Sequence, residues 1–420
     1  MKLRECLHRR GERGQTLIML TIMAMVLFLF AGLAIDGSMA YLTKADLAKA
    51  VDAACLAGMR NRYRGESVAR TVAQNAFNAN YAKTDLNPKG RSIRYNANFA
   101  TDPSSGNRVF NVSATADIKT FFMRLLPGAS ITSIAVNAQS TRADLIMSLV
   151  LDRSGSMTGD GGASALPPAV TDFVSHFDNN LDQVAMVSFA GNDTVNVAIT
   201  YNFIDPITTA VNALNFVGAT YAYGGLVDAR AQNNVTVPAG RNVVKAVVFF
   251  TDGIANTVED NLSCPGFPLI NYGGNAPTEN TSIAFMNPAT GNTQCSITDG
   301  GHPSCCVAPG GFPSQKYNTL KPFTRDFITQ DAEFRTAQLA ALMRAETPHP
   351  TVIYSIGLGT DINIDFLKQL ANTSDSSTYD STQPSGKAYA VTSCPSGSCT
   401  SDLQNAFDDI ANDLLLRLTK

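Results

Sequence analysis

Five oxygen-bearing side chains recur at positions that suit a divalent cation. Asp152, Ser154 and Ser156 alternate in the segment Asp-Arg-Ser-Gly-Ser, directly after a run of apolar residues. Asp252 follows another apolar run, and Thr220 lies in a glycine-containing segment between them. No His or Cys stands near these positions. Hard oxygen ligands of this kind suit Mg²⁺, Ca²⁺ or Mn²⁺, and octahedral coordination with retained water is typical of Mg²⁺.

Each of these motifs, taken alone, has a simpler interpretation than metal binding. The Ser-Gly-Ser segment could cap a helix, and Thr251-Asp252-Gly253 could form a turn. Both aspartates, however, follow apolar runs that read as strands. In an open α/β sheet, ligands bind beyond the carboxyl ends of the strands. We therefore predict that the motifs meet at one edge of a sheet and hold a metal there.

The pattern of apolar runs predicts the sheet itself. Near-continuous apolar runs, typical of parallel strands buried on both faces, occupy 145–151, 183–190, 243–251 and 351–358. Helical patterns intervene at 166–177, 207–216, 223–233 and 324–346, and a last helix begins at Ser401. Residues 194–201 read as an antiparallel edge strand. This alternation predicts a doubly wound, Rossmann-like α/β domain with a mainly parallel sheet over 143–420.

A different module is expected to precede this domain. Ala40 to Asn78 has the spacing of one amphipathic helix with a face of small residues. Within 92–140, apolar and polar residues alternate in three runs that are separated by turn residues. These runs predict a small antiparallel sheet with one solvent-exposed face. Residues 36–142 therefore read as a pilin-like α+β module.

The N-terminus reads as a membrane anchor. Residues 1–14 are basic, and residues 15–35 carry no charge. As a helix, the stretch from Gly14 to Ile35 would be roughly 33 Å long, enough to cross a hydrocarbon core of about 30 Å. The basic side should stay in the cytoplasm, which sends the rest of the chain across the membrane. A cleaved signal peptide, with Gly32-Leu33-Ala34 at the cleavage site, is the alternative.

Cysteine usage agrees with export. Six cysteines lie in loops rich in Gly, Pro, Ser and Asn, and they are disulfide candidates in an oxidising compartment: Cys264, Cys295, Cys305, Cys306, Cys394 and Cys399. Cys394 and Cys399 are the easiest pair to assign, and the other four allow three pairings. A zinc site that includes His302 is a weaker alternative. The Cys-rich insert at 253–323 starts directly after Asp252, so it should emerge beside the predicted metal site, as either a recognition surface or a protective loop.

Composition excludes several classes of protein. The 420 residues are 45% hydrophobic and 16% charged, which is unlike a disordered chain. A formal net charge of −3 gives no general attraction to nucleic acid. The sequence contains no nucleophile elbow, no zinc-protease helix motif and no P-loop, and the four His stand in no triad-like context. We therefore expect a protein that is not an enzyme.

With its strand order and its DxSxS…T…D arrangement, the region from 144 to 420 resembles a von Willebrand factor type A (VWA) domain with a metal-ion-dependent adhesion site. The resemblance implies that Ser154, Ser156 and Thr220 touch the metal, while Asp152 and Asp252 act largely through water. Neutral inner ligands leave most of the positive charge of the cation uncompensated, so a carboxylate from a protein partner could complete its coordination.

The N-terminal half has its own resemblance. A start of Arg-Arg-Gly-Glu-Arg-Gly-Gln, a hydrophobic segment, an Ala-rich helix and a C-terminal VWA domain together look like a TadG-type Tad/Flp pilus assembly protein. The resemblance implies a single-pass inner-membrane protein whose C-terminal domain is periplasmic, with delivery to the cell surface left open. Its partners would be pilins or other pilus assembly components. The Glu that prepilin peptidases favour is missing, which supports a retained anchor. The alternative is a structural assembly component whose VWA domain acts without metal.

Overall fold

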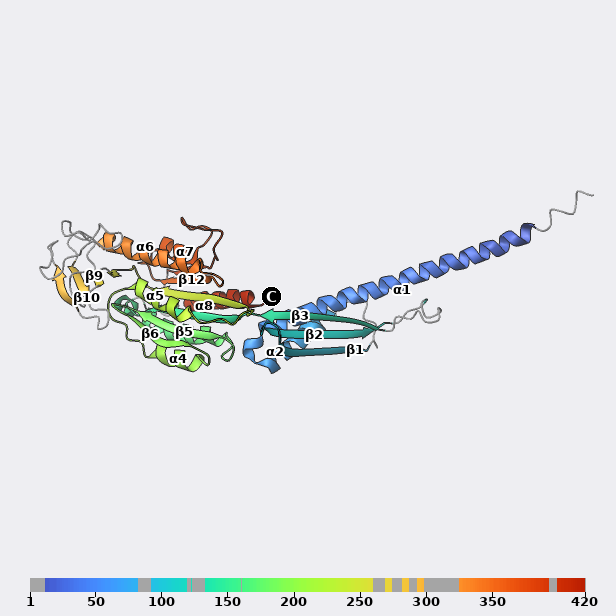
Figure 1. The fold of residues 1–420 in the computed structure, drawn as a ribbon, viewed down its shortest axis with the longest axis horizontal. Helices are drawn as coiled ribbons and strands as arrows, with labels where there is room; N and C mark the ends of the chain where they lie inside the picture. Colours follow the sequence, from blue (N-terminus) through green and yellow to red (C-terminus); the bar gives the residue numbers. More distant parts are fainter. Residues whose placement is uncertain are drawn as a thin grey trace, which may run out of the picture. The chain divides into compact units, whose positions relative to one another are not determined.

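The computed structural model describes residues 12–81, 92–118, 122, 133–159, 161–259, 269–273, 282–286, 293–297, 325–392 and 399–419. The chain divides into two compact units (Figure 1). The first unit consists of Met1–Asp102 and Arg108–Thr141. The second consists of Pro103–Asn107 and Arg142–Lys420.

The first unit begins with one long helix. Helix α1 runs over Glu12–Arg60, and its N-terminal part is long and apolar enough to cross a membrane. The prediction of one helix from Ala40 to Asn78 is wrong in one respect, because the helix is interrupted. A short 3₁₀ turn at Arg62–Arg64 ends at Gly65, whose φ of +94° favours glycine. Helix α2 then runs over Glu66–Tyr81 and packs against α1.

The predicted small sheet is confirmed in this unit. Strands β1 (Ile93–Thr101), β2 (Arg108–Asp117) and β3 (Ser133–Arg142) form a three-stranded sheet in the order β1-β2-β3, and β1 and β2 are antiparallel. Alternate side chains of β2, such as Phe110 and Val112, are buried against the helices. Burial on one face only explains the period-two pattern.

The second unit contains the predicted parallel sheet. Its six strands lie in the order β13-β12-β7-β4-β5-β6. Their bounds are Asp144–Asp152 for β4, Gln183–Phe189 for β5, Asp193–Thr200 for β6, Val243–Thr251 for β7, Thr351–Leu358 for β12 and Ala388–Val391 for β13. The pairings are parallel except that of β6, which is antiparallel to β5 as predicted. The four central strands are almost fully buried, which accounts for their continuous apolar sequences.

Helices cover both faces of this sheet. Helices α5 (Ala222–Asn233), α6 (Arg325–Arg344) and α7 (Ile364–Ala371) share one core with Val150, Phe249 and Ile353 of the strands. On the other face, α3 (Gly162–Ser175) packs on α8 (Cys399–Leu418), with the rings of Phe173 and Phe407 5.1 Å apart. Helix α4 (Ile204–Asn212) packs against α3. The doubly wound architecture is therefore confirmed, while α7 and β13 are elements that the sequence patterns did not reveal.

The Cys-rich insert is more regular than its composition indicates. It contains strands β8 (Thr257–Glu259), β9 (Leu269–Gly273), β10 (Ser282–Met286) and β11 (Thr293–Ile297), which form an antiparallel sheet in the order β11-β10-β9-β8. Of the disulfide and zinc candidates, Cys264, His302, Cys305, Cys306 and Cys394 lie outside the described residues. Only the backbone is described for Cys295 and Cys399, so the cysteine pairing stays a prediction.

Candidate metal centre

The carboxyl ends of two neighbouring strands bring the predicted aspartates to one edge of the sheet. Asp152 ends β4, and Asp252 directly follows β7, which pairs with β4 in parallel. The Thr251 hydroxyl donates a 2.7 Å hydrogen bond to Asp152 Oδ2. The Ser154 backbone N–H donates to Asp152 Oδ1, also at 2.7 Å. Both oxygens of Asp152 are thus held by the loops that carry the remaining candidate ligands.

The two serine hydroxyls and Asp252 form a compact oxygen cluster. Ser154 Oγ lies 3.0 Å from Ser156 Oγ. The Ser154 and Ser156 hydroxyls donate to the same oxygen of Asp252, Oδ1, at 3.3 Å and 2.9 Å. Three oxygens that were predicted from two separate motifs therefore converge on one point. Ser156 is exposed, while Ser154 and Asp252 are 1% exposed, so the cluster opens to solvent on the side of Ser156.

Backbone hydrogen bonds tie the Thr220 loop to this cluster. The Gly155 N–H donates to the carbonyl of Gly218, and the Val217 N–H donates to the carbonyl of Arg153. Gly218 adopts a φ of +105°, a conformation for which glycine is suited. Thr220 is 4% exposed, and across the described ranges no hydrogen bond joins its hydroxyl to the other four side chains. The loop thus lies beside the cluster, with Thr220 as its least directly connected member.

Two side chains that the sequence patterns did not single out support the arrangement. Thr251 binds Asp152, as described above. Asn256 accepts a 2.7 Å hydrogen bond at Oδ1 from the N–H of Thr220, and its own N–H donates to the carbonyl of Thr220. Asn256 therefore links the segment after β7 to the Thr220 loop. Its position four residues after Asp252 was the available signal, but such a polar residue in a loop is too common to predict a role.

Burial dominates the electrostatics of the cluster. Asp152 is fully buried, and this burial raises the pKa of its carboxyl, against the opposing effect of the hydrogen bonds from Ser154 and Thr251. Burial lowers the pKa of Arg153, because it disfavours the charged form of a base as it does that of an acid. The Arg153 guanidinium donates to Ser188 Oγ at 3.2 Å and to Asn192 Oδ1 at 2.7 Å. The half-buried Arg153 therefore ties the neighbouring loop to the end of β4.

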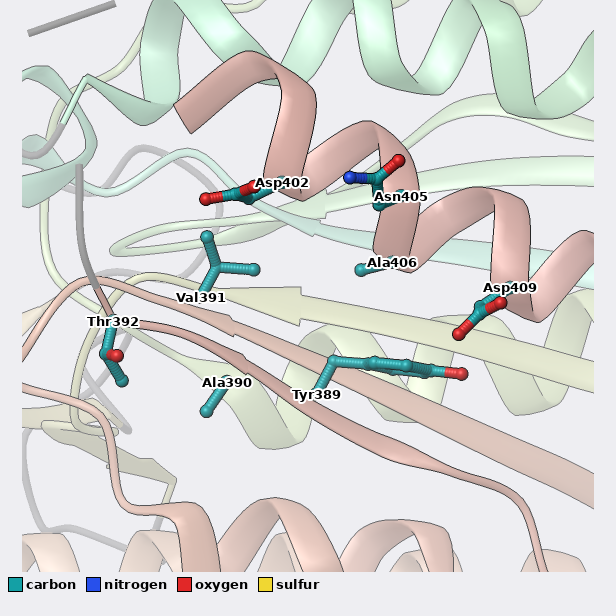
Figure 2. A pocket seen from close by; sticks show the side chains of 8 residues that line it. All are labelled: Tyr389, Ala390, Val391, Thr392, Asp402, Asn405, Ala406 and Asp409. Carbon is teal, nitrogen blue, oxygen red and sulfur yellow. The ribbon is translucent and has the colours of Figure 1, made fainter. Parts of the chain in front are cut away.

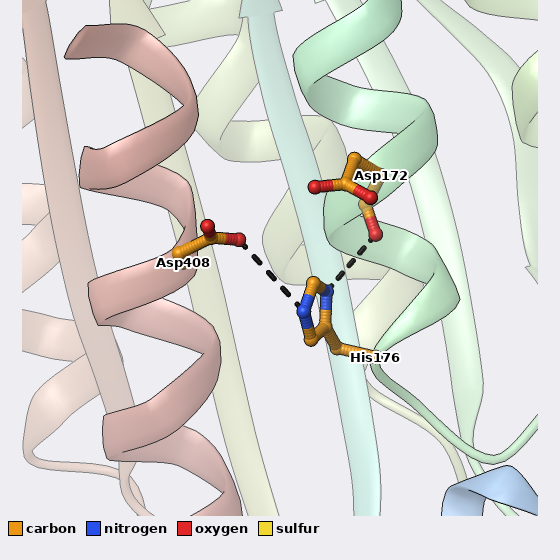
Figure 3. Close-up of side chains that lie close together, drawn as sticks. All are labelled: Asp172, His176 and Asp408. Carbon is orange, nitrogen blue, oxygen red and sulfur yellow. Dashed lines mark hydrogen bonds and ion pairs between the residues drawn. The ribbon is translucent and has the colours of Figure 1, made fainter. Parts of the chain in front are cut away.

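A second group of potential ligands lies between α3 and α8 (Figure 3). His176 Nδ1 lies 3.0 Å from the backbone carbonyl of Asp172, and Nε2 lies 3.8 Å from Asp408 Oδ1. The side chains of His176 and Asp408 are 28% and 43% exposed. This solvent-facing group links the end of α3 to α8.

An acidic groove lies between the edge strand β13 and helix α8 (Figure 2). It has a volume of about 280 Å³, with Asp402, Asn405 and Asp409 on the helix and Tyr389 on the strand. Burial, followed by the charges of Asp409 and Asp413, raises the pKa of Tyr389 to about 12. The groove is suited to a cationic group, and we assign it no role in the candidate metal centre.

Two protein-family models match separate parts of the chain. The model of the von Willebrand factor type A domain matches residues 147–278. The Tad model, which describes a Flp pilus-assembly TadE/G-like region, matches residues 14–61. The chain therefore carries a VWA domain and, near its N-terminus, a TadE/G-like region. A search of curated proteins finds no match.

Solved structures with a similar fold include pilus proteins. The PilB minor pilin from Streptococcus sanguinis is 14% identical, with 78% of this chain and 79% of that chain covered and a TM-score of 0.42. The VWA domain of the type V pili tip protein Mfa5 from Porphyromonas gingivalis is 16% identical, with 66% and 97% covered and a TM-score of 0.40. Proximal thread matrix protein 1 from the mussel byssus is 17% identical, with 66% and 47% covered and a TM-score of 0.36. Likeness at this level carries no weight for what this chain binds.

Proposed function

We propose that this protein is a membrane-anchored pilus assembly or adhesion protein whose VWA domain captures an acidic side chain of a partner through a divalent cation. Ser154, Ser156 and Thr220 would hold the cation directly, and Asp152 and Asp252 would hold it largely through water. When bound, the cation would supply an electrophilic centre with room for one outside carboxylate. No chemical step is required of it, so we propose a binding function rather than catalysis.

The observation that carries the proposal is the 3.0 Å separation of Ser154 Oγ and Ser156 Oγ beside Asp252. Two oxygens that coordinate Mg²⁺ at right angles, each about 2.1 Å from the ion, would be about 3.0 Å apart. Ca²⁺, with ligands at about 2.4 Å, would separate them to about 3.4 Å. The residues therefore fit a divalent cation of this class, with Mg²⁺, Ca²⁺ and Mn²⁺ as the candidates.

The surroundings of the cluster support an open coordination position. Asp152, Ser154 and Asp252 are buried and fixed by hydrogen bonds, whereas Ser156 is exposed. A partner can therefore approach from one side only. Because the innermost ligands are neutral hydroxyls, an incoming carboxylate would meet a cation that keeps most of its charge. Such a contact is both strong and selective for acidic side chains.

The N-terminal helix supports the cellular setting. Helix α1 contains one apolar segment that is long enough to span a membrane, and the basic residues before it favour a cytoplasmic N-terminus. We propose that residues 15–35 anchor the chain in the inner membrane, and that the 36–142 module and the 143–420 VWA domain lie outside the cytoplasm. The TadE/G-like match supports pilins or other pilus assembly components as partners.

The test is pilus assembly by cells that carry the Ser154→Ala/Ser156→Ala double variant in place of the wild-type chain. We expect surface pili to be lost or their attachment to be abolished, while the variant still accumulates in the membrane fraction at the wild-type level. A Ser164→Ala/Ser175→Ala variant, which changes two exposed serines of α3, is the matched control. Normal piliation and attachment in the first variant would instead support a structural component that acts without metal.

A further inference from the structure

A second polar site lies at the opposite end of strand β7 from Asp252. A groove of about 540 Å³ is lined by residues of α5, the start of β7 and the segment between α6 and β12. Its volume lies within the range of small-molecule sites. Lys245 is six residues before Thr251, so roughly 20 Å of strand separates the groove from the candidate metal centre. The two sites are thus distinct.

Lys245 is the unusual feature of this groove. Its side chain lines the groove, yet the residue is only 8% exposed. Within the described residues, its ammonium group makes no hydrogen bond or ion pair. Lys245 shares its face of the sheet with Val247 and Phe249, which are core residues. The aliphatic stem of Lys245 is therefore buried, while its ammonium reaches the solvent of the groove, where an anionic ligand could pair with it.

Other polar groups near Lys245 also favour an anionic ligand. Thr351 is the register partner of Lys245 on β12, so both side chains lie on one face of the sheet. The Thr351 hydroxyl is buried, and it has no hydrogen-bond partner in the part of the chain that the structure describes. Arg230 and His349 also line the groove. The two cationic side chains of the lining, Lys245 and Arg230, therefore outweigh its single carboxylate, Glu346.

Glu346 and Arg230 occupy one wall of the groove. Arg230 Nε lies 2.7 Å from Glu346 Oε1, and the two side chains are 44% and 30% exposed. Since an exposed pair of this kind contributes little to stability, a ligand can compete with Glu346 for Arg230. The wall itself is fixed, because Asn233 at the end of α5 donates to the carbonyl of Ala246, next to Lys245, at 2.8 Å.

We propose that this groove binds a small organic anion through Lys245 and Arg230. The charged head would be a carboxylate or a phosphate monoester, because both accept hydrogen bonds from ammonium and guanidinium groups. Part of the ligand would be apolar, since Val227, Ala231 and Pro348 lie in the lining, beside the polar Asn234 and Thr347. This site is independent of the proposed cation, so either can fail without the other.

The test is isothermal titration of the full-length protein, in detergent, with hexanoate and with hexyl phosphate, and with hexanol as the uncharged probe. We expect at least one anion to bind, and hexanol to bind at least tenfold more weakly. The stronger of the two anions identifies the head group. Lys245→Met, which keeps the length of the side chain, should weaken binding at least tenfold. Glu346→Gln should tighten it several-fold, because it frees Arg230.

Stability in the absence of ligand gives a second readout. If Lys245 is kept for an anion, Lys245→Met should abolish binding without lowering the unfolding midpoint. A purely structural lysine would lower the midpoint when it is replaced. The proposal is overturned if neither anion binds the wild-type protein, if Lys245→Met binds both as tightly, or if Glu346→Gln leaves the affinity unchanged or weaker.

Discussion

The hydroxyl of Thr251 donates to the carboxylate of Asp152 at 2.7 Å, and this contact joins the carboxyl ends of β7 and β4. Asp152 is fully buried, so each donor that satisfies it contributes to the stability of the edge. The contact also fixes the strand end from which Ser154 and Ser156 follow. Asp152 and the loop that carries Ser154 and Ser156 are therefore positioned by the edge of the sheet.

Replacement of Thr251 by Val should destabilise the VWA domain. The substitution keeps the shape of the side chain but removes a donor to a buried carboxylate, which costs about 1.5–3 kcal/mol. The measurement is the urea unfolding transition of the full-length protein. Thr209→Val, at an exposed position on α4, is the control and should change the free energy of unfolding by less than about 0.5 kcal/mol. Equal stability of the two variants would contradict the role of Thr251.

The loss of the buried ion pair of Arg142 and Asp182 should reduce the free energy of unfolding far more than the loss of an exposed pair. The two side chains are 3% and 0% exposed and 2.6 Å apart, and Asp182 also accepts from the N–H groups of Leu145 and Asp178. Arg142→Met would leave a buried carboxylate without its counter-charge, at a cost of about 3–5 kcal/mol in urea unfolding.

Arg94→Met provides the comparison for this pair. Arg94 and Asp117 form an exposed pair, with side chains 65% and 41% exposed. Its loss should cost at most about 1 kcal/mol. Similar losses of stability in Arg142→Met and Arg94→Met would show that the burial of Arg142 has no energetic consequence.

Asp228 should make the stability of the protein depend on pH. Burial, together with the nearby charge of Asp193, raises the pKa of Asp228 to about 6 from an ordinary value near 3.8. The folded state then favours the protonated form, so its stabilisation is complete below about pH 4 and is lost as the pH rises through 6. Asp228→Asn should therefore be more stable than wild type at pH 8, by a margin that shrinks towards pH 5.

Thermal unfolding between pH 5 and pH 8 measures this margin. Asp361→Asn, at an exposed position, serves as the control for the substitution itself. A constant difference between Asp228→Asn and wild type across the range would exclude the predicted ionisation.

Gly58 on α1 should tolerate no side chain. A Cβ atom there would lie 2.2 Å from Cε1 of Phe110 and 3.0 Å from Cβ of Ala73. Gly58→Val should destabilise the first unit by roughly 1–3 kcal/mol through overpacking. Gly37→Ala, where a Cβ would meet nothing within 4 Å, should stabilise α1 by up to about 1 kcal/mol. Amide hydrogen exchange over α1 and α2 would measure both, and slower exchange in Gly58→Val than in wild type would refute the clash.

The sequence predicted best those strands that are buried on both faces. Continuous apolar runs predicted β4, β5, β7 and β12, because strands covered on both faces need apolar side chains on both. Strand β13 was missed because it is a four-residue edge strand with little burial. The interruption of the helix at Gly65 was missed because the helical spacing of small residues continues on both sides of it.

The candidate metal centre, like the fold, could be predicted only in part. Asp152 and Asp252 could be placed together because parallel strands end at one edge. The contributions of Thr251 and Asn256 could not, since they depend on hydrogen bonds between loops that sequence spacing does not encode. The four-stranded sheet of the insert was hidden by its Gly- and Asn-rich composition, which resembles that of an irregular loop.

Isothermal titration of the full-length protein with Mg²⁺ tests the central proposal most directly. We predict that one Mg²⁺ binds per chain, and that the Ser154→Ala/Ser156→Ala variant binds it at least tenfold more weakly, a loss of at least about 1.4 kcal/mol. The Ser164→Ala/Ser175→Ala control should bind it as the wild type does. Equal Mg²⁺ affinity in the wild type and the Ser154→Ala/Ser156→Ala variant, or no binding by the wild type, would contradict the assignment of this site.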